Sequence, residues 1–268
     1  MKIAAIQMVS GTRVQANLDA ARLLLAEAAG QGAEMAVLPE YFCIMGQKDT
    51  DKLKVREEAG SGMIQEFLSR SARELGLWIV GGTLPTATGK DGRARNSSLA
   101  YDPTGACVAR YDKIHLFKFA VDNEAHDETR VLDAGTQPVR FELASRDGST
   151  YTVGLSICYD LRFPELYRAL SADLLLVPSA FTYITGQAHW ELLLRARAIE
   201  NLAYVVAAAQ GGVHENGRRT WGHSMVVGPW GEILAGQDEG PGVVMGEVLA
   251  SRLHGVRQSL PALDHRVL

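Results

Sequence analysis

The most constraining feature of this sequence is the alternation of short apolar runs with amphipathic segments. Residues 2–8 and 35–39 are short apolar runs, and residues 14–29 between them carry apolar side chains at helical spacing. A second helix is predicted over residues 62–75, and three strand-like runs with only turn residues between them follow over residues 77–117. Strand–helix–strand units imply parallel pairing, whereas successive hairpins imply antiparallel pairing. The pattern therefore predicts an α/β fold of two mixed sheets stacked face to face, with a helical layer over each.

The same alternation continues through the second half of the chain. It predicts strands over 152–160, 173–180, 203–210, 222–229 and 242–248, and helices over 163–172, 189–201 and 250–260. The segment from Lys118 to Gly135 is polar, acidic and aperiodic, so we expect a long irregular loop there.

Length and composition limit the class of protein. Apolar runs recur from the first strand to the last and nothing reads as a linker, so residues 1–268 are expected to form one domain. Hydrophobic residues make up 47% and charged residues 22%, as in ordinary soluble proteins. The formal charge is −4 and Lys and Arg form no basic stripe, which argues against nucleic acid as a partner.

Targeting signals and cysteine usage point to the cytoplasm. The opening MKIAAIQMVSGT has too short an apolar run for a signal peptide, and no run in the chain reaches the length of a membrane span. The three cysteines, Cys43, Cys107 and Cys158, have unrelated spacings. We therefore expect reduced thiols, a cytoplasmic location and no membrane partner.

Cys158 is the candidate nucleophile. It ends an apolar strand and lies shortly before a helix that begins near Pro164, so it is expected at a sheet edge near the positive end of a helix dipole. That position favours the thiolate over the thiol. The alternative is an ordinary buried cysteine, since free cysteines are among the most buried residues. Cys43 and Cys107 are interpreted as such ordinary residues.

Glu40 and Lys113 are the candidate charged partners of this thiol. Glu40 directly follows an apolar strand, where partial burial would raise its pKa toward that of a useful general base. Lys113 follows a strand of alternating character, and a lysine beside a thiolate would lower the cysteine pKa and could stabilise an oxyanion. Taken singly, each is also compatible with a solvated residue at a strand end. Together, a carboxylate, an ammonium and a thiol are expected to meet at one sheet edge.

Other catalytic patterns fit less well. No histidine lies beside Cys158, and the histidines lack the spacings of a zinc site, so no metal or other cofactor is predicted. The segment GLSIC has Ser156 but lacks the final glycine of a serine nucleophile elbow.

Three motifs carry a resemblance to a known family. LPEYF at 38–42, YDKIHLF at 111–117 and GLSICYDLRFPEL at 154–166 resemble the signatures of the nitrilase, or carbon–nitrogen hydrolase, superfamily. The similarity extends to residues 178–201 and 221–234 and covers essentially the whole chain. It implies a four-layer α-β-β-α sandwich that dimerises into an eight-layer unit, and hence a homodimer or higher homo-oligomer.

The resemblance also implies catalytic roles. Glu40 would be the general base and Cys158 the nucleophile that attacks an amide carbonyl to form a thioester, which water then hydrolyses. Lys113 and the backbone N–H of Tyr159 would hold the oxyanion. The segment DETRVLDAG at 127–135 places a second glutamate at Glu128, which would orient Lys113 and the substrate.

Four segments narrow the resemblance within the superfamily: CYDLRFPEL at 158–166, TGQAHWELLLRARAIEN at 185–201, VVAAAQ at 205–210 and GHSMVVGPWG at 222–231. They look most like the branch of deaminated glutathione amidases and ω-amidases. This implies a small-molecule amide of a 2-oxo acid as substrate. Arg162 would bind its carboxylate, since guanidinium binds carboxylates bidentately, with Phe181 and Thr185 on the same pocket. The alternative for Arg162 is a structural salt bridge with Glu165 or Asp160.

Several other functions stay open at this point. Deaminated glutathione is favoured over short ω-amides such as α-ketoglutaramate and succinamate, with N-carbamoyl amino acid amidohydrolysis as a second enzyme reading. Nitrile hydrolases fit less well, because they carry tryptophan where Tyr159 stands. A non-enzymatic scaffold that retains the fold is the remaining alternative.

Overall fold

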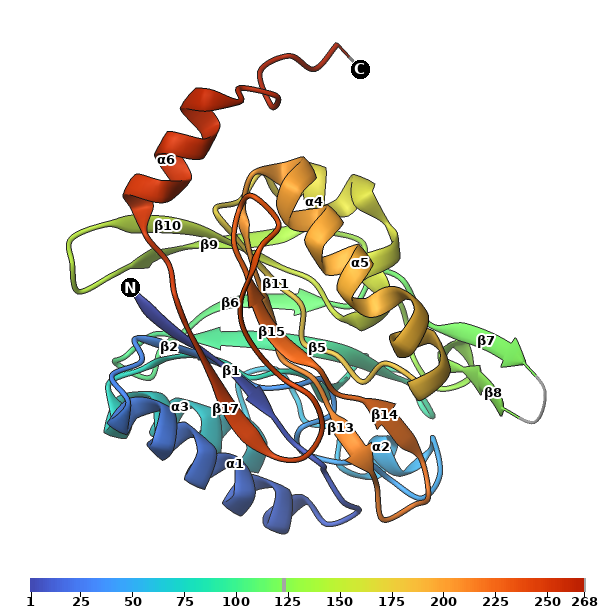
Figure 1. Cartoon of the computed structure of the whole chain (residues 1–268). Helices are drawn as coiled ribbons and strands as arrows, with labels where there is room; N and C mark the ends of the chain where they lie inside the picture. The colour runs from blue at the N-terminus through green and yellow to red at the C-terminus, as the bar shows by residue number, and fades with distance from the viewer. Residues whose placement is uncertain (122–123, 268) are drawn as a thin grey trace.

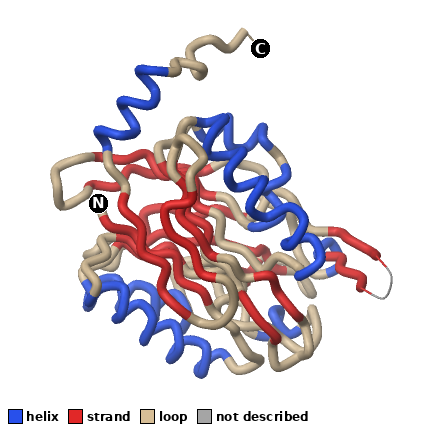
Figure 2. Tube along the Cα trace, viewed as in Figure 1, coloured by secondary structure: helices blue, strands red, loops and turns tan. Residues whose placement is uncertain are grey.

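Two mixed β-sheets pack face to face at the centre of the molecule, with helices over their outer faces (Figure 1). The computed structural model describes residues 1–121 and 124–267. Figure 2 shows the strands gathered in the middle, with one group of helices below them and another above. The predicted four-layer α-β-β-α architecture is confirmed.

The first sheet has seven strands, in the order β17-β1-β2-β3-β5-β4 with β6 paired to β5. Its strands are β1 (Lys2–Gln7), β2 (Met35–Val37), β3 (Trp78–Val80), β4 (Leu84–Ala87), β5 (Ala94–Tyr101), β6 (Cys107–Asp112) and β17 (Gly242–Glu247). Strands β1, β2 and β3 are parallel because helices α1 (Val14–Gly30) and α3 (Met63–Leu75) connect them. These two helices bury their apolar stripes on the outer face of the sheet. The short helix α2 (Asp51–Lys54) lies in the connection before α3.

The second sheet has six strands, in the order β16-β15-β12-β11-β10-β9. Its strands are β9 (Val139–Ala144), β10 (Thr150–Leu155), β11 (Leu174–Leu176), β12 (Tyr204–Ala207), β15 (Ser224–Val227) and β16 (Ile233–Gln237). Helices α4 (Pro164–Leu170) and α5 (Tyr183–Asn201) connect its parallel strands and cover its outer face. A small hairpin of β13 (Gly211–Val213) and β14 (Arg219–Trp221) stands beside this sheet.

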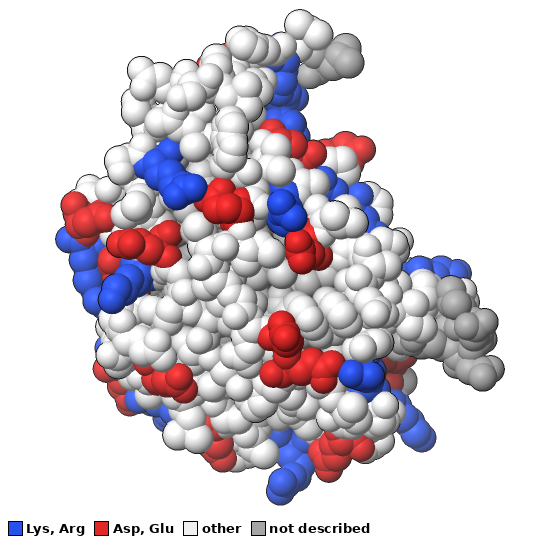
Figure 3. Space-filling model, in the orientation of Figure 1, with Lys and Arg blue, Asp and Glu red and all other residues white. Residues whose placement is uncertain are grey.

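The main core lies between the two sheets. Ile3 and Val37 from the first sheet and Val153 and Leu174 from the second belong to one cluster of fully buried side chains. Helix α6 (Ala250–Ser259) and the segment after it extend away from the sheets (Figure 1). Figure 3 shows charged side chains around this face of the molecule and an uncharged area at its centre, over β15 and β17. Within the described ranges, no helix is both long and apolar enough to cross a membrane.

The irregular loop predicted from Lys118 to Gly135 is wrong over its first half. Strands β7 (Lys118–Val121) and β8 (Glu124–Asp127) form an antiparallel hairpin that projects from the body (Figure 1), and the 3-10 turn η1 (Glu128–Arg130) follows it. Each strand of this hairpin is only four residues long, and β8 carries a single apolar residue, Ala125, so the sequence pattern does not separate the hairpin from a loop.

Two element ends near the predicted site also differ from expectation. Helix α5 begins at Tyr183, six residues before the predicted start, because the Thr182 side chain caps it by accepting a hydrogen bond from the Thr185 N–H. The strand predicted over 152–160 ends at Leu155, and Cys158 begins the 3-10 turn η2 (Cys158–Arg162). The nucleophile therefore lies in a turn beyond the strand.

Candidate active site

Segments from both sheets meet around one small cavity. Glu40 follows β2 and Lys113 follows β6 in the first sheet, whereas Cys158 lies beyond β10 in the second. The cavity has a volume of about 20 Å³, enough for about one water molecule. All of the residues that the sequence singled out line it: Glu40, Lys113, Glu128, Cys158, Tyr159, Arg162, Phe181 and Thr185.

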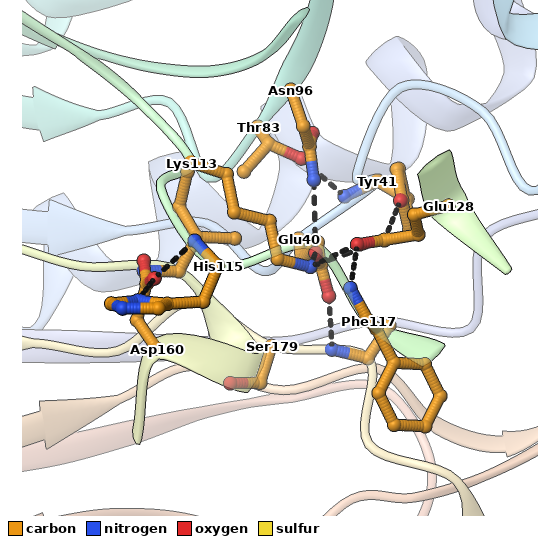
Figure 4. A network of polar contacts seen from close by, with 12 residues as sticks. Glu40, Tyr41, Thr83, Asn96, Lys113, His115, Phe117, Glu128, Asp160 and Ser179 are labelled. Atoms are coloured by element: carbon orange, nitrogen blue, oxygen red, sulfur yellow. Dashed lines mark hydrogen bonds and ion pairs between the residues drawn. The ribbon is translucent and has the colours of Figure 1, made fainter. Parts of the chain in front are cut away.

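Glu40 is held rigidly across the junction between the sheets. This residue is 1% exposed, and its Oε1 accepts hydrogen bonds from Lys113 Nζ at 2.8 Å and from Asn96 Nδ2 at 2.9 Å (Figure 4). Oε2 accepts a 2.9 Å hydrogen bond from the backbone N–H of Ala180, which follows β11 of the second sheet. These donors fix both carboxylate oxygens beside the thiol. Sequence reasoning missed Asn96 and the Ala180 N–H, because no local pattern marks either one.

Lys113 lies between two carboxylates. Its Nζ is 2.8 Å from Glu40 Oε1 and 2.9 Å from Glu128 Oε2, and the side chain is 1% exposed. Burial alone would lower the pKa of Lys113, but the charges of Glu128, Glu40 and Cys158 raise it well above its usual value. The ammonium is therefore a permanent positive charge in the cavity.

Glu128 begins η1 and is held by donors on both oxygens. The Tyr41 hydroxyl donates a 2.6 Å hydrogen bond to Oε1, and the Phe117 N–H donates a 2.7 Å hydrogen bond to Oε2 (Figure 4). Burial raises the pKa of Glu128, but Lys113 and Lys52 outweigh it and lower the pKa to about 2. Glu128 is therefore ionised at neutral pH and fixes the position of the Lys113 ammonium. Tyr41 was not singled out, although it stands next to Glu40 in the LPEYF motif.

Cys158 has a strained backbone and a protonated side chain. Its φ of 49° lies in the left-handed region that favours glycine, and its N–H donates a 3.0 Å hydrogen bond to the Pro178 carbonyl. Burial and the negative charge of Glu40 raise the pKa of the thiol well above its usual value, and Lys113 only partly offsets them. The predicted preference for the thiolate is therefore wrong in this structure. A thiol beside a fixed carboxylate is arranged for proton transfer as it attacks.

Comparison with known proteins settles the family. Residues 2–258 match the family described as carbon-nitrogen hydrolase. This chain belongs to the carbon–nitrogen hydrolase family. It is a hydrolase that acts on carbon–nitrogen bonds other than peptide bonds, and the predicted superfamily is confirmed.

Three relatives illustrate how far the similarity extends. The hydrolase is 43% identical to the deaminated glutathione amidase of Synechocystis sp. (strain PCC 6803 / GT-S), over 98% of this chain and 97% of that one. It superposes on the Caenorhabditis elegans NitFhit protein with a TM-score of 0.86 and 35% identity, covering 99% of this chain and 65% of the other. For a mutant amidase from Nesterenkonia sp. AN1, with acrylamide added to its active-site cysteine, the TM-score is 0.78 and the identity 27%, over 97% and 98% of the two chains.

A buried carboxylate holds the catalytic segments of this hydrolase together, a role that the sequence did not indicate for Asp160. Asp160 accepts hydrogen bonds from the Tyr111 hydroxyl at 2.7 Å, the His115 N–H at 3.0 Å and the Ile157 N–H at 2.9 Å. His115 Nδ1 also lies 2.7 Å from Asp160 (Figure 4). These contacts join the turn that carries Cys158 to the segment that carries Lys113 in the hydrolase. Its place in the GLSICYDLRFPEL motif, two residues after Cys158, is the sequence signal for it.

Arg162 forms neither of the salt bridges considered as the alternative for it. Asp160 is already occupied by its own donors, and among the described residues neither it nor Glu165 forms an ion pair with Arg162. The guanidinium instead lies 5.7 Å from the Phe181 ring, and its Nη2 lies 3.3 Å from His189 Nδ1. Its charge therefore remains available to the cavity of the hydrolase.

Thr185 and Phe181 complete this wall of the cavity. The hydroxyls of Thr185 and Thr182 are 2.8 Å apart at the start of α5, and the Phe181 ring packs 4.8 Å from the Trp190 ring. Among residues 1–121 and 124–267, no group of three or more His, Cys, Asp or Glu side chains could hold a metal ion.

Proposed function

We propose that this hydrolase cleaves amides of 2-oxo acids and that its substrate is deaminated glutathione. The observation that carries the proposal is the position of Arg162 in the wall of the cavity that also contains Glu40, Lys113 and Cys158. A guanidinium that has no carboxylate partner among the described residues suits the 2-oxo-acid end of such a substrate, and Phe181 and Thr185 line the same wall. The Synechocystis relative, named deaminated glutathione amidase, supports this choice.

Acylation begins with the Cys158 thiol. Glu40 takes the thiol proton as sulfur attacks the amide carbonyl, which becomes a tetrahedral oxyanion. Lys113 and the N–H of Tyr159, which has no hydrogen-bond acceptor among the described residues, stabilise that oxyanion. The carbon–nitrogen bond then breaks, and Glu40 returns the proton to the departing amine. The products of this half-reaction are an acyl thioester on Cys158 and a free amine.

Deacylation uses the same groups. A water molecule gives a proton to Glu40 as its oxygen attacks the thioester carbonyl, and the oxyanion again lies beside Lys113 and the Tyr159 N–H. Collapse of the intermediate breaks the carbon–sulfur bond, and the proton on Glu40 restores the thiol. The released acid is 2-oxoglutarate when the substrate is deaminated glutathione.

The competing substrates differ in the amine that leaves. Deaminated glutathione carries cysteinylglycine on its scissile carbonyl, whereas α-ketoglutaramate and N-carbamoyl-β-alanine both release ammonia. Assays should therefore follow cysteinylglycine by its new α-amine and ammonia by a coupled reaction, with wild type and Cys158→Ala. We expect the highest kcat/KM with deaminated glutathione and no turnover by Cys158→Ala. Undiminished turnover by this variant would refute the nucleophile, and preference for the carbamoyl substrate would refute the substrate class.

We propose further that the hydrolase forms homodimers through α5 and the turn before β16. Ile199, Trp230 and Ile233 are exposed apolar side chains there, and Arg195 Nε joins the two segments by donating a 2.8 Å hydrogen bond to the Gly231 carbonyl. Light scattering should give twice the chain mass for wild type and a lower mass for Ile199→Lys. A wild-type monomer at all concentrations would overturn this assembly.

A further inference from the structure

A second, larger cavity lies directly outside the catalytic one. Its volume is about 610 Å³, within the range that accommodates small-molecule ligands. Tyr41 and Arg218 line both cavities, so the two meet at these residues. The mechanism proposed above uses no group of the outer cavity.

The outer cavity is positively charged where it meets the inner one. Among the described residues, neither Lys52 nor Arg218 forms an ion pair with a carboxylate. Lys52 Nζ lies 4.4 Å from the Tyr41 ring centroid and donates a 3.4 Å hydrogen bond to the Tyr41 hydroxyl. Arg218 Nη2 donates a 3.1 Å hydrogen bond to the Ala180 carbonyl. Arg219, which lines the same cavity, is by contrast paired with Glu239 at 2.8 Å.

These two cations are incompletely compensated. The Nε of Arg218 is buried and has no hydrogen-bond acceptor in the part of the chain that the structure describes. Burial lowers the pKa of Lys52, and Arg218 lowers it as well, although Glu128 and Asp49 act in the opposite direction. Leaving charged donors buried without acceptors costs free energy, which a bound anion would recover. Asp49 is the one acidic side chain on the described lining of this cavity.

We propose that the outer cavity binds the leaving group of the substrate, and that Lys52 and Arg218 bind a carboxylate at its far end. The inference rests on the proposed function, in which Arg162 binds the carboxylate of the acyl part. A substrate that spans both cavities then carries one carboxylate on each side of its scissile amide. Deaminated glutathione has this form, because its leaving group, cysteinylglycine, ends in a carboxylate.

The test compares three amides that share one acyl group: deaminated glutathione, its C-terminal glycinamide and α-ketoglutaramate. Wild type should prefer the free acid to the glycinamide by about 10- to 100-fold in kcat/KM, mainly through KM, because charged hydrogen bonds are at stake. In Arg218→Gln and Lys52→Gln this preference should fall toward one. Both variants should also lose at least about 10-fold more on deaminated glutathione than on α-ketoglutaramate.

Arg22→Gln is the matched control, because it removes one positive charge from a surface ion pair with Glu74. This variant should retain the preference for the free acid. No preference in wild type, or equal losses on all three amides in both cavity variants, would overturn the inference. If Arg218→Gln fails to fold, Lys52→Gln is the deciding variant, since Lys52 contacts only the hydroxyl and ring of Tyr41 within residues 1–121 and 124–267.

A binding measurement separates this inference from the proposed function. Absence of turnover with every 2-oxo-acid amide would refute the function. Calorimetry of cysteinylglycine with the Cys158→Ala protein would still test the outer cavity. The inference predicts that the Cys158→Ala protein binds cysteinylglycine amide more weakly than cysteinylglycine. It also predicts that cysteinylglycine binds more weakly to a protein that carries both Cys158→Ala and Arg218→Gln. Equal binding in all three cases overturns it.

Discussion

The Tyr41 hydroxyl donates a 2.6 Å hydrogen bond to Glu128, the carboxylate that lies 2.9 Å from Lys113 Nζ. Tyr41 also follows Glu40 directly in the chain, and Glu40 is the other carboxylate on Lys113. Tyr41 therefore links the two carboxylates that flank the Lys113 ammonium: its backbone is bonded to that of Glu40, and its hydroxyl is hydrogen-bonded to Glu128. The φ of Tyr41 is positive, 57°, and its side chain points toward Glu128 (Figure 4).

Tyr41→Phe should lower kcat by about 10-fold, because it removes one hydrogen bond to a charged group. The KM for α-ketoglutaramate should change little. Steady-state kinetics with this small amide checks the prediction, with circular dichroism to verify folding. A loss as large as that caused by Glu40→Gln would contradict a purely positioning role.

Cys158 should react with iodoacetamide only at high pH, because burial and Glu40 raise its pKa. The midpoint of the pH–rate curve is expected above the ordinary thiol pKa of about 8.5. Glu40→Gln should shift this midpoint to lower pH, since it removes the negative charge that disfavours the thiolate. Mass spectrometry of the Cys158 peptide measures the rate, and the exposed Cys107 monitors the reagent. An unchanged midpoint in Glu40→Gln would contradict the assigned cause.

Glu128 should make the fold sensitive to acid. Burial raises its pKa, but Lys113 and Lys52 together lower it to about 2 in the folded state, below the ordinary value of 4.5. The ionised carboxylate therefore stabilises the fold above the unfolded pKa, and this contribution is lost as the pH falls from about 4.5 toward about 2. Urea unfolding from about pH 7 to about pH 3 should show a larger loss of stability for wild type than for Glu128→Gln. Parallel losses would refute the linkage.

Asp160→Asn should destabilise the protein by about 2 kcal/mol, because an amide cannot accept from all the donors that surround Asp160. It should also reduce kcat, since the turn that carries Cys158 loses its tie to the segment that carries Lys113. Glu74→Gln, which breaks a surface pair with Arg22, is the control and should cost less than about 0.5 kcal/mol. Urea denaturation and steady-state kinetics measure both effects. Equal stability of the two variants would show that the Asp160 network is dispensable.

Local patterns in the sequence predict the two stacked sheets, the helical layers over them and the residues at the ends of the strands. Glu40 could be found because an apolar strand directly precedes it, and Lys113 and Cys158 because motifs of the family surround them. Asn96 and the Ala180 N–H could not, since their contacts with Glu40 exist only when distant segments pack together. The protonated state of Cys158 likewise depends on burial and on Glu40, neither of which a strand-end position reveals.

Neither sheet contains a complete set of reacting groups. Glu40 and Lys113 come from one sheet, and Cys158 and the Ala180 N–H come from the other. The rate of turnover therefore depends on how the two sheets are positioned relative to each other. A displacement of about 1 Å between them can lower the rate by about 100-fold while every strand remains intact. As denaturant loosens the interface between the sheets, catalysis should disappear first and the circular dichroism of helices and strands later.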